Sequence, residues 1–259
     1  MALHVAFAAS LRPSPLSLLA LLLVGGGVAS LLGDGLPWNE DPAACDPLER
    51  ACESDAGATN SPSDHTAPAP TLSAGNTCID VGYLCAELAQ NEGIRLQRWR
   101  NFEGTLVVHV PLPNSEDPAV GRALQRAAAQ GLRAWNGQPF LILADLRGDR
   151  DPHFTIRWTP SLGGSQLGVA RTRWSPSTGL TVLSIELVTR NPFRPGQVAD
   201  ARQIRLTAAH EMGHALGLAH SDTRRDIMYP TNTATSMSAQ DYRTIEVLYR
   251  MQDGTLIRR

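Results

Sequence analysis

Residues 209–221 read AHEMGHALGLAHS, and the interpretation of the chain starts from this stretch. His210 and His214 are four residues apart, so in a helix their rings lie on one face, one turn apart, and both can reach one metal ion. Gly217 allows the helix to end, because glycine readily adopts the left-handed conformation of a helix C-terminus. The chain can then turn His220 back towards the same ion. Three neutral imidazoles that leave one coordination position open are a ligand set of catalytic zinc.

Glu211 follows the first histidine and lies close enough to act as general base for a metal-bound water. A bare HExxH pattern also occurs by accident on core helices with incidental histidines. The glycine and the third histidine at fixed positions make that explanation improbable for this chain. We therefore expect Glu211 to be catalytic and His210, His214 and His220 to bind one Zn2+ ion.

The segment from His210 to His220 resembles the extended zinc signature of the metzincins, HExxHxxGxxH. In these zinc endopeptidases three histidines bind the metal and a methionine lies on a tight turn beneath it. Residues 227–230 read IMYP, so the resemblance implies that Met228 shapes the floor under the metal. Ser221 directly after the third histidine is similar to the matrixins. The closing sequence SAQDYRTIEVLYR is also matrixin-like.

This resemblance covers roughly residues 104–250 and implies an α+β, sandwich-like fold. The expected parts are a twisted mixed sheet, an active-site helix, a second long helix and a C-terminal helix. The implied activity is hydrolysis of internal peptide bonds in protein or peptide substrates, which bind as an extended strand along residues 167–173. Leu206 and Pro230 match positions that border the pocket for the residue after the cleaved bond. A leucine at position 206 predicts an open, apolar pocket.

Two other functions remain as alternatives. A zinc-binding surface or adhesion protein could keep the same fold without cleaving anything, but metal binding alone does not require the carboxylate of Glu211. A self-processing enzyme could act mainly on its own linker. Both alternatives leave the zinc ligands unchanged.

The chain departs from the matrixin pattern in its latency and structural-metal features. No PRCG-type cysteine switch is found, and residues 145–170 contain a single histidine, His153. We therefore do not expect the structural zinc of vertebrate matrixins. A Ca2+ ion at Asp149 or Asp151 is the alternative to a simply solvated acidic turn.

Apolar periodicity predicts where the main elements lie. Residues 106–110 alternate as a strand does, Asp117 and Pro118 form a helix start, and Ser238 with Asp241 forms a capping box for the last helix. The further elements expected are a helix from 117 to about 135, strands at 140–143, 154–158 and 180–188, and a helix from about 200 to 216.

The region before residue 104 has a different character. Residues 1–30 resemble a secretory signal peptide, with an uncleaved membrane anchor as the alternative. Residues 31–75 form an acidic linker rich in Pro, Ala and Ser, and residues 76–103 form a short, propeptide-like segment. The catalytic domain is expected at 104–252, followed by a tail at 253–259. The protein is thus expected outside the cell, without a stable membrane span in its mature form.

The cysteines and the net charge limit the remaining possibilities. Cys45, Cys52, Cys78 and Cys85 form an even set that indicates disulfides in an exported chain, although three connectivities are possible. Cys78 or Cys85 capping the zinc in a precursor is the alternative. The 23 basic residues are scattered against 25 acidic ones, giving a net charge of -2, so nucleic acid is not an expected partner.

Overall fold

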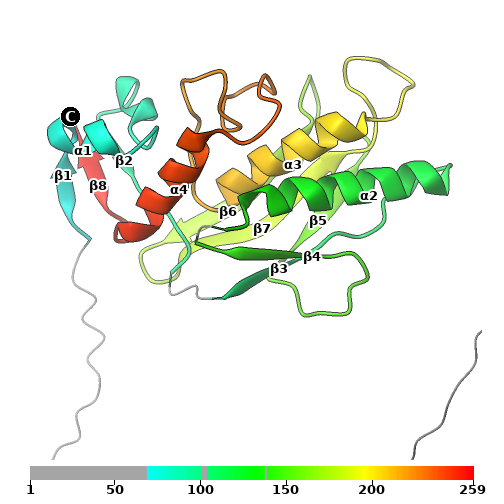
Figure 1. Cartoon of the computed structure of the whole chain (residues 1–259), viewed down its shortest axis with the longest axis horizontal. Helices are drawn as coiled ribbons and strands as arrows, with labels where there is room; N and C mark the ends of the chain where they lie inside the picture. The colour runs from blue at the N-terminus through cyan, green and yellow to red at the C-terminus, as the bar shows by residue number, and fades with distance from the viewer. Residues whose placement is uncertain (1–68, 101–103, 138) are drawn as a thin grey trace, which may run out of the picture. The chain divides into compact units, whose positions relative to one another are not determined.

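The computed structural model describes residues 69–100, 104–137 and 139–259. Its main sheet has five strands in the order β4-β3-β5-β7-β6. Neighbouring strands are parallel except at one edge, where β6 runs antiparallel to β7. The strands are β3 (Thr105–His109), β4 (Leu141–Asp145), β5 (Phe154–Thr159), β6 (Gly168–Ser175) and β7 (Gly179–Val188). The mixed sheet and α+β fold expected from the sequence are confirmed (Figure 1).

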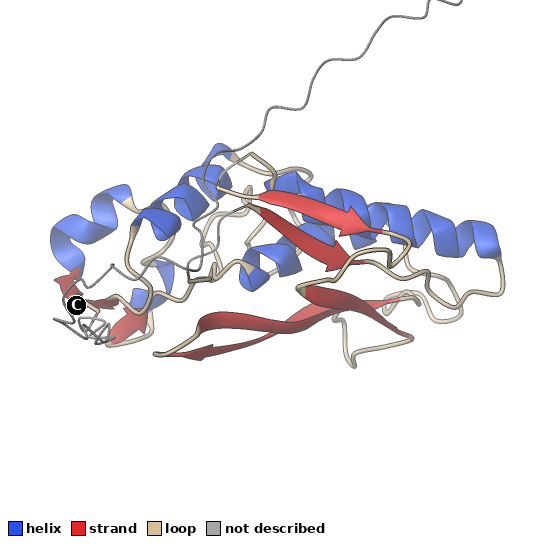
Figure 2. Cartoon of the chain, turned by 90° about the horizontal axis from the view of Figure 1, so that it is seen from below, coloured by secondary structure: helices blue, strands red, loops and turns tan. Residues whose placement is uncertain are grey.

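Two long helices lie side by side over this sheet (Figure 1). α2 (Pro118–Leu132) contacts β4, and α3 (Ala201–Ala215) contacts β6 and β7. The helices approach closely at Gly131, where an added Cβ would clash with the carbonyl oxygen of Arg205. Figure 2 shows the helices and the strands by colour from a second direction.

The sequence of α2 explains both its start and its buried face. The carboxylate of Asp117 accepts a hydrogen bond of 2.7 Å from the backbone N–H of Ala119, and Pro118 occupies the first helical position. Leu124, Ala128 and Leu132 recur at helical spacing and are buried. This face therefore packs against α3 and the sheet.

α3 is capped at both ends by the residue types expected there. The side chain of Asp200 accepts a hydrogen bond from the backbone N–H of Gln203 at 3.0 Å. At the other end Gly217 has a φ of +101°, and the N–H of Leu218 donates to the carbonyl of Gly213 at 2.9 Å. This left-handed cap ends the helix and redirects the chain towards His220.

The last helix, α4 (Ala239–Arg250), begins with the predicted capping box of Ser238 and Asp241. Ile245 and Leu248 are fully buried on its inner face. α4 is followed by β8 (Leu256–Arg258), which is the middle strand of a second, three-stranded sheet in the order β1-β8-β2.

Residues 69–100, called the cap segment below, supply the rest of this second sheet. Its elements are β1 (Thr71–Ser73), α1 (Ala74–Asp80), the 3-10 turn η1 (Ala86–Ala89) and β2 (Gly93–Arg95). β1 pairs with β8 in parallel and β2 pairs with it antiparallel. The structure therefore places residues 71–75, expected in a linker, and residues 256–258 of the expected tail in regular structure that no local periodicity indicates.

A disulfide joins Cys78 and Cys85 inside the cap segment, which selects one pair from the possible connectivities. Cys45 and Cys52, the predicted signal peptide at 1–30 and nearly all of the predicted linker lie outside the described residues. In the described part of the chain, no helix combines the length and the apolar character that crossing a bilayer requires.

Candidate metal centre

The three histidines of the signature meet at one point. His210 and His214 lie one turn apart on α3, with their Nε2 atoms 3.1 Å apart, and His220 reaches them after the turn at Gly217. One nitrogen from each ring lies within 4.8 Å of the others. The helix and its glycine cap thus hold three potential ligands on one side of the site.

Backbone carbonyls determine which ring nitrogens face the metal position. Nδ1 of His210 lies 2.7 Å from the carbonyl oxygen of Ile227, and Nδ1 of His214 lies 2.8 Å from that of Leu218. A carbonyl oxygen can only accept, so each Nδ1 carries the hydrogen and each Nε2 presents a lone pair. Such outer hydrogen bonds orient metal-binding histidines.

The charge state of these rings suits a cation. Burial lowers the pKa of His210 to about 4, and burial together with the neighbouring His210 lowers the pKa of His214 to about 3. Both rings are therefore neutral near pH 7, and their two lone pairs face each other without a proton between them. Nitrogen ligands of tetrahedral zinc are about 3.3 Å apart, from Zn–N bonds of about 2.0–2.1 Å. The residues present thus fit a zinc ion.

Glu211 lies beside this cluster and against the edge of the sheet. Its Oε2 accepts a hydrogen bond of 2.7 Å from the backbone N–H of Ala170 in β6. Burial raises its pKa to about 7. The close approach requires glycine at position 168, since a Cβ there would lie 2.9 Å from Cγ of Glu211. Glu211 is therefore held where it can exchange a proton near pH 7.

Met228 lies under the metal-binding helix. It is fully buried, and an added Cβ on Gly213 would clash with its Sδ. The N–H of Ser221 donates to the carbonyl of Met228 at 2.9 Å, which ties the residue after the third histidine to this turn. Met228 is not part of the group of side chains that converges on the metal position.

The turn before Met228 is supported from α4. The carboxylate of Asp241, fully buried, accepts hydrogen bonds from the N–H of Ile227 at 2.9 Å and from the hydroxyl of Tyr83 at 3.1 Å. Ile227 in turn provides the carbonyl that orients His210. A continuous set of contacts therefore runs from the cap segment through Asp241 to a metal-binding histidine.

A cleft of about 740 Å³ opens above the histidines and Glu211. Residues 165–170 form one side of it, and residues 230–233 form another. Residues 133–250 match the family model of the matrixins. The chain carries a matrixin-like metzincin domain. A separate comparison with curated proteins found no match.

The matrixin-like domain places the two predicted pocket residues apart. Pro230 lines the metal cleft. Leu206 lines an adjoining cavity of about 520 Å³ together with Arg202 and Asp200. The α3 residues that reach the metal cleft on this side are Gln203 and Thr207. These two residues were not predicted from the sequence. Gln203, Thr207 and Glu211 follow one another at intervals of four residues, and this spacing could have placed all three on one helix face.

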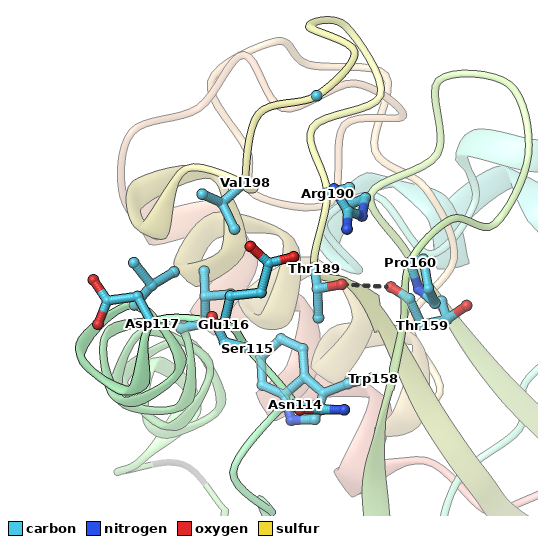
Figure 3. A pocket seen from close by; sticks show the side chains of 13 residues that line it. Asn114, Ser115, Glu116, Asp117, Trp158, Thr159, Pro160, Thr189, Arg190 and Val198 are labelled. Carbon is cyan, nitrogen blue, oxygen red and sulfur yellow. Dashed lines mark hydrogen bonds between the residues drawn. The ribbon is translucent and has the colours of Figure 1, made fainter.

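A third cavity, of about 600 Å³, shares no lining residue with the metal cleft of the matrixin-like domain. Figure 3 shows it between the start of α2, the end of β5 and the segment after β7. Glu116 and Arg190 are among its lining residues, and Trp158 is held there by a hydrogen bond of 2.8 Å to the carbonyl of Pro111. Its lining residues form no group of converging metal ligands among the described residues, so the candidate metal centre is the histidine cleft.

The acidic loop after β4, where Asp149 and Asp151 were considered as Ca2+ ligands, is held by the side chain of Asp145. Asp145 accepts hydrogen bonds from the backbone N–H groups of Arg147, Gly148 and Arg150, and these lower the pKa of Asp145 despite the opposing effect of burial. Asp149 and Asp151 are exposed, and among the described residues they belong to no group of converging ligands. Nothing in this loop supports a Ca2+ site.

Proposed function

We propose that this protein is a secreted zinc-dependent endopeptidase that hydrolyses internal peptide bonds with Glu211 as its general base. The observation that supports this most directly is the neutral three-histidine cluster with a buried carboxylate beside it, at the bottom of an open cleft. A site that only stored zinc would have no use for this carboxylate.

Zinc, when held by His210, His214 and His220, supplies a Lewis acid that polarises the scissile carbonyl and makes water more acidic. Glu211 takes the proton of the attacking water and transfers it to the leaving amine. Burial raises the pKa of this carboxyl to about 7 in the metal-free fold, and a cation held by the neighbouring histidines would lower it again, which keeps Glu211 ionised and able to accept the proton near neutral pH. The hydrogen bond from Ala170 orients the carboxylate for this exchange.

Strand β6 offers a template for the substrate backbone. It pairs with β7 on one side, and no strand of the described residues pairs with its other side. Gly168, Val169 and Ala170 line the cleft at the same place. An extended peptide that adds to this edge would bind through its main chain and pass over the catalytic carboxylate.

Export is part of this proposal. The disulfide between Cys78 and Cys85 is of a kind that persists in oxidising compartments, which supports the predicted secretion. Expression of the full chain in a secreting host, followed by N-terminal sequencing of the protein in the medium, tests it. A protein retained in the cell with its first residues intact would contradict secretion.

The decisive experiment compares wild type with Glu211→Gln, which keeps the size of the side chain but removes the base. We expect both proteins to bind one zinc ion, and cleavage of casein by the variant to be lower by about 10²–10⁴-fold. Chelation should abolish wild-type cleavage and added zinc should restore it. Equal absence of cleavage in both zinc-loaded proteins would favour the non-cleaving binding protein. Cleavage of the linker alone would favour self-processing.

A further inference from the structure

The wall of the metal cleft next to Glu211 is polar, which was not expected from the sequence. Gln203, Thr207 and Glu211 follow one another at intervals of four residues on α3 and all line the cleft. Asn232 lines it from the segment after the methionine turn. Leu206, the basis for expecting an apolar pocket, lines only the neighbouring cavity, whereas Gln203 and Asn232 line both.

The side chain of Thr207 is held with its hydroxyl towards Asn232. Its Oγ1 accepts a hydrogen bond of 2.7 Å from Nδ2 of Asn232. Its methyl group lies against β6, where a Cβ at Gly168 would come within 2.6 Å of it. The hydroxyl hydrogen is bonded to no acceptor within the described residues, so Thr207 can still donate a hydrogen bond.

Gln203 presents the complementary group. Its Oε1 is shielded from solvent and is the one buried side-chain oxygen or nitrogen in the described ranges without a hydrogen-bond partner. A buried acceptor without a partner is costly, so a ligand that donates to it gains affinity. The terminal amide can turn about its last bond, and a partner with both a donor and an acceptor complements either orientation.

The wall formed by Gln203, Thr207 and Asn232 carries no charge of its own. Apart from the three histidines and Glu211, none of the residues that line the cleft is ionisable. A lysine or a glutamate that packs against this wall would lose water without gaining an opposite charge from the wall. Leucine would leave the groups on both Thr207 and Gln203 unpaired.

We infer that this part of the cleft selects a carboxamide side chain, glutamine in the first place, in the substrate residue that follows the cleaved bond. The carboxamide is neutral, its NH2 group can donate to Gln203, and its oxygen can accept from Thr207. The inference rests on the proposed endopeptidase function and names the substrate class of the same site.

Peptide cleavage tests the inference in the zinc-loaded full chain. A decapeptide library that varies only the residue after the cleaved bond should show a kcat/KM for glutamine about tenfold or more above that for leucine. The double variant Gln203→Leu with Thr207→Val should reverse this preference. Thr181→Val, on β7 and outside the cleft, removes a hydroxyl elsewhere and should keep it. A wild-type preference for leucine or methionine overturns the inference and leaves the endopeptidase function intact.

A binding measurement separates the inference from turnover. Two hydroxamates, which chelate zinc, would carry either a glutamine or a leucine side chain in the same frame, and calorimetry would measure their affinity for the zinc-loaded protein. We expect the glutamine compound to bind about tenfold or more tightly to wild type and to lose this advantage in the double variant. Equal affinities, or tighter binding of the leucine compound, overturn the inference even if no peptide is cleaved. Absence of all cleavage with a retained glutamine preference contradicts the endopeptidase function alone.

Discussion

Burial shifts the pKa values of three neighbouring side chains of α3, those of His210, Glu211 and His214, so that each favours its neutral form in the metal-free fold. It lowers the pKa of His210 from 6.5 to about 4 and that of His214 to about 3, and it raises the pKa of Glu211 from 4.5 to about 7. The histidines therefore oppose folding when the medium is acidic enough to protonate them in the unfolded chain. Glu211 has the opposite effect, because its carboxyl group gains a proton on folding.

These shifts predict how the stability of the metal-free protein depends on pH. Between pH 4.5 and 6.5 the unfolded chain holds two protons on these residues and the folded chain holds one. From these residues the free energy of unfolding should thus fall by about 1.4 kcal/mol per pH unit towards acid, or about 3 kcal/mol over this window, and His220, whose pKa burial also lowers, adds to the fall. Denaturant titrations of chelator-treated protein measure it. With His210, His214 and His220 all replaced by asparagine, Glu211 alone of this cluster remains and the slope should reverse. A slope of the same sign in this variant would contradict the assignment.

At the scale of elements, α4 connects the cap segment to the metal site through hydrogen bonds. Asp241 binds the hydroxyl of Tyr83 and the N–H of Ile227, whose carbonyl orients His210. Tyr83→Phe leaves one oxygen of a buried carboxylate short of a partner, at a cost of about 1–3 kcal/mol in unfolding free energy. We also expect zinc to dissociate faster, as followed with a chromogenic chelator.

Tyr242→Phe is the matched control for this prediction. Its hydroxyl donates to the carbonyl of Ala134 at 3.0 Å, so the variant also loses one phenolic hydrogen bond of α4, but none that leads to the methionine turn. Zinc release should remain at the wild-type rate in this control. If Tyr83→Phe lowers stability and leaves zinc release unchanged, Tyr83 supports the fold and does not position the ligand.

The elements that sequence predicts best are those determined by local signals. α2, α3 and α4 begin at Asp117, Asp200 and Ser238, as their capping residues indicated, and the expected strands coincide with β3, β5 and β7. The three histidines could be grouped because a helix and one glycine relate them. Asn232 could not be assigned to the cleft, because its contact with Thr207 joins residues 25 apart in the sequence through an irregular segment.

At the scale of the whole molecule, the two ends of the described chain depend on each other. β8 lies between β1 and β2, and Asp253 accepts hydrogen bonds from the N–H of Arg98 at 3.0 Å and the indole of Trp174 at 2.9 Å. The strand pairings and the bond from Arg98 join segments more than 150 residues apart, as the separation of 155 between Arg98 and Asp253 illustrates, and Trp174 lies 79 residues from Asp253. Three-residue strands have no periodicity that could predict such pairing.

The cap segment also contacts the end of α3, which carries two of the three histidines. The indole N–H of Trp99 donates to the carbonyl of Ala215 at 2.8 Å, and the carbonyl oxygen of Gln97 occupies the space that a side chain at Gly217 would need. These contacts act on the turn that directs His220 to the metal position. The start of the catalytic domain at residue 104 stays a prediction. Because Gln97 and Trp99 contact the end of α3, the segment before residue 104 is expected to be needed for the fold.

Two truncated chains test this dependence, one comprising residues 69–259 and the other residues 104–259. The shorter chain leaves β8 without either neighbour and the carbonyl of Ala215 without Trp99, so the turn before His220 loses its support. We expect the longer chain to unfold cooperatively on heating and to retain zinc.

The shorter chain should lose both properties, because unpaired strand and helix-end groups must be satisfied by water. Circular dichroism melting and zinc analysis after gel filtration measure these outcomes. A shorter chain that melts cooperatively with bound zinc would show that residues 69–103 are a removable propeptide and that the metal site is held by the catalytic domain alone.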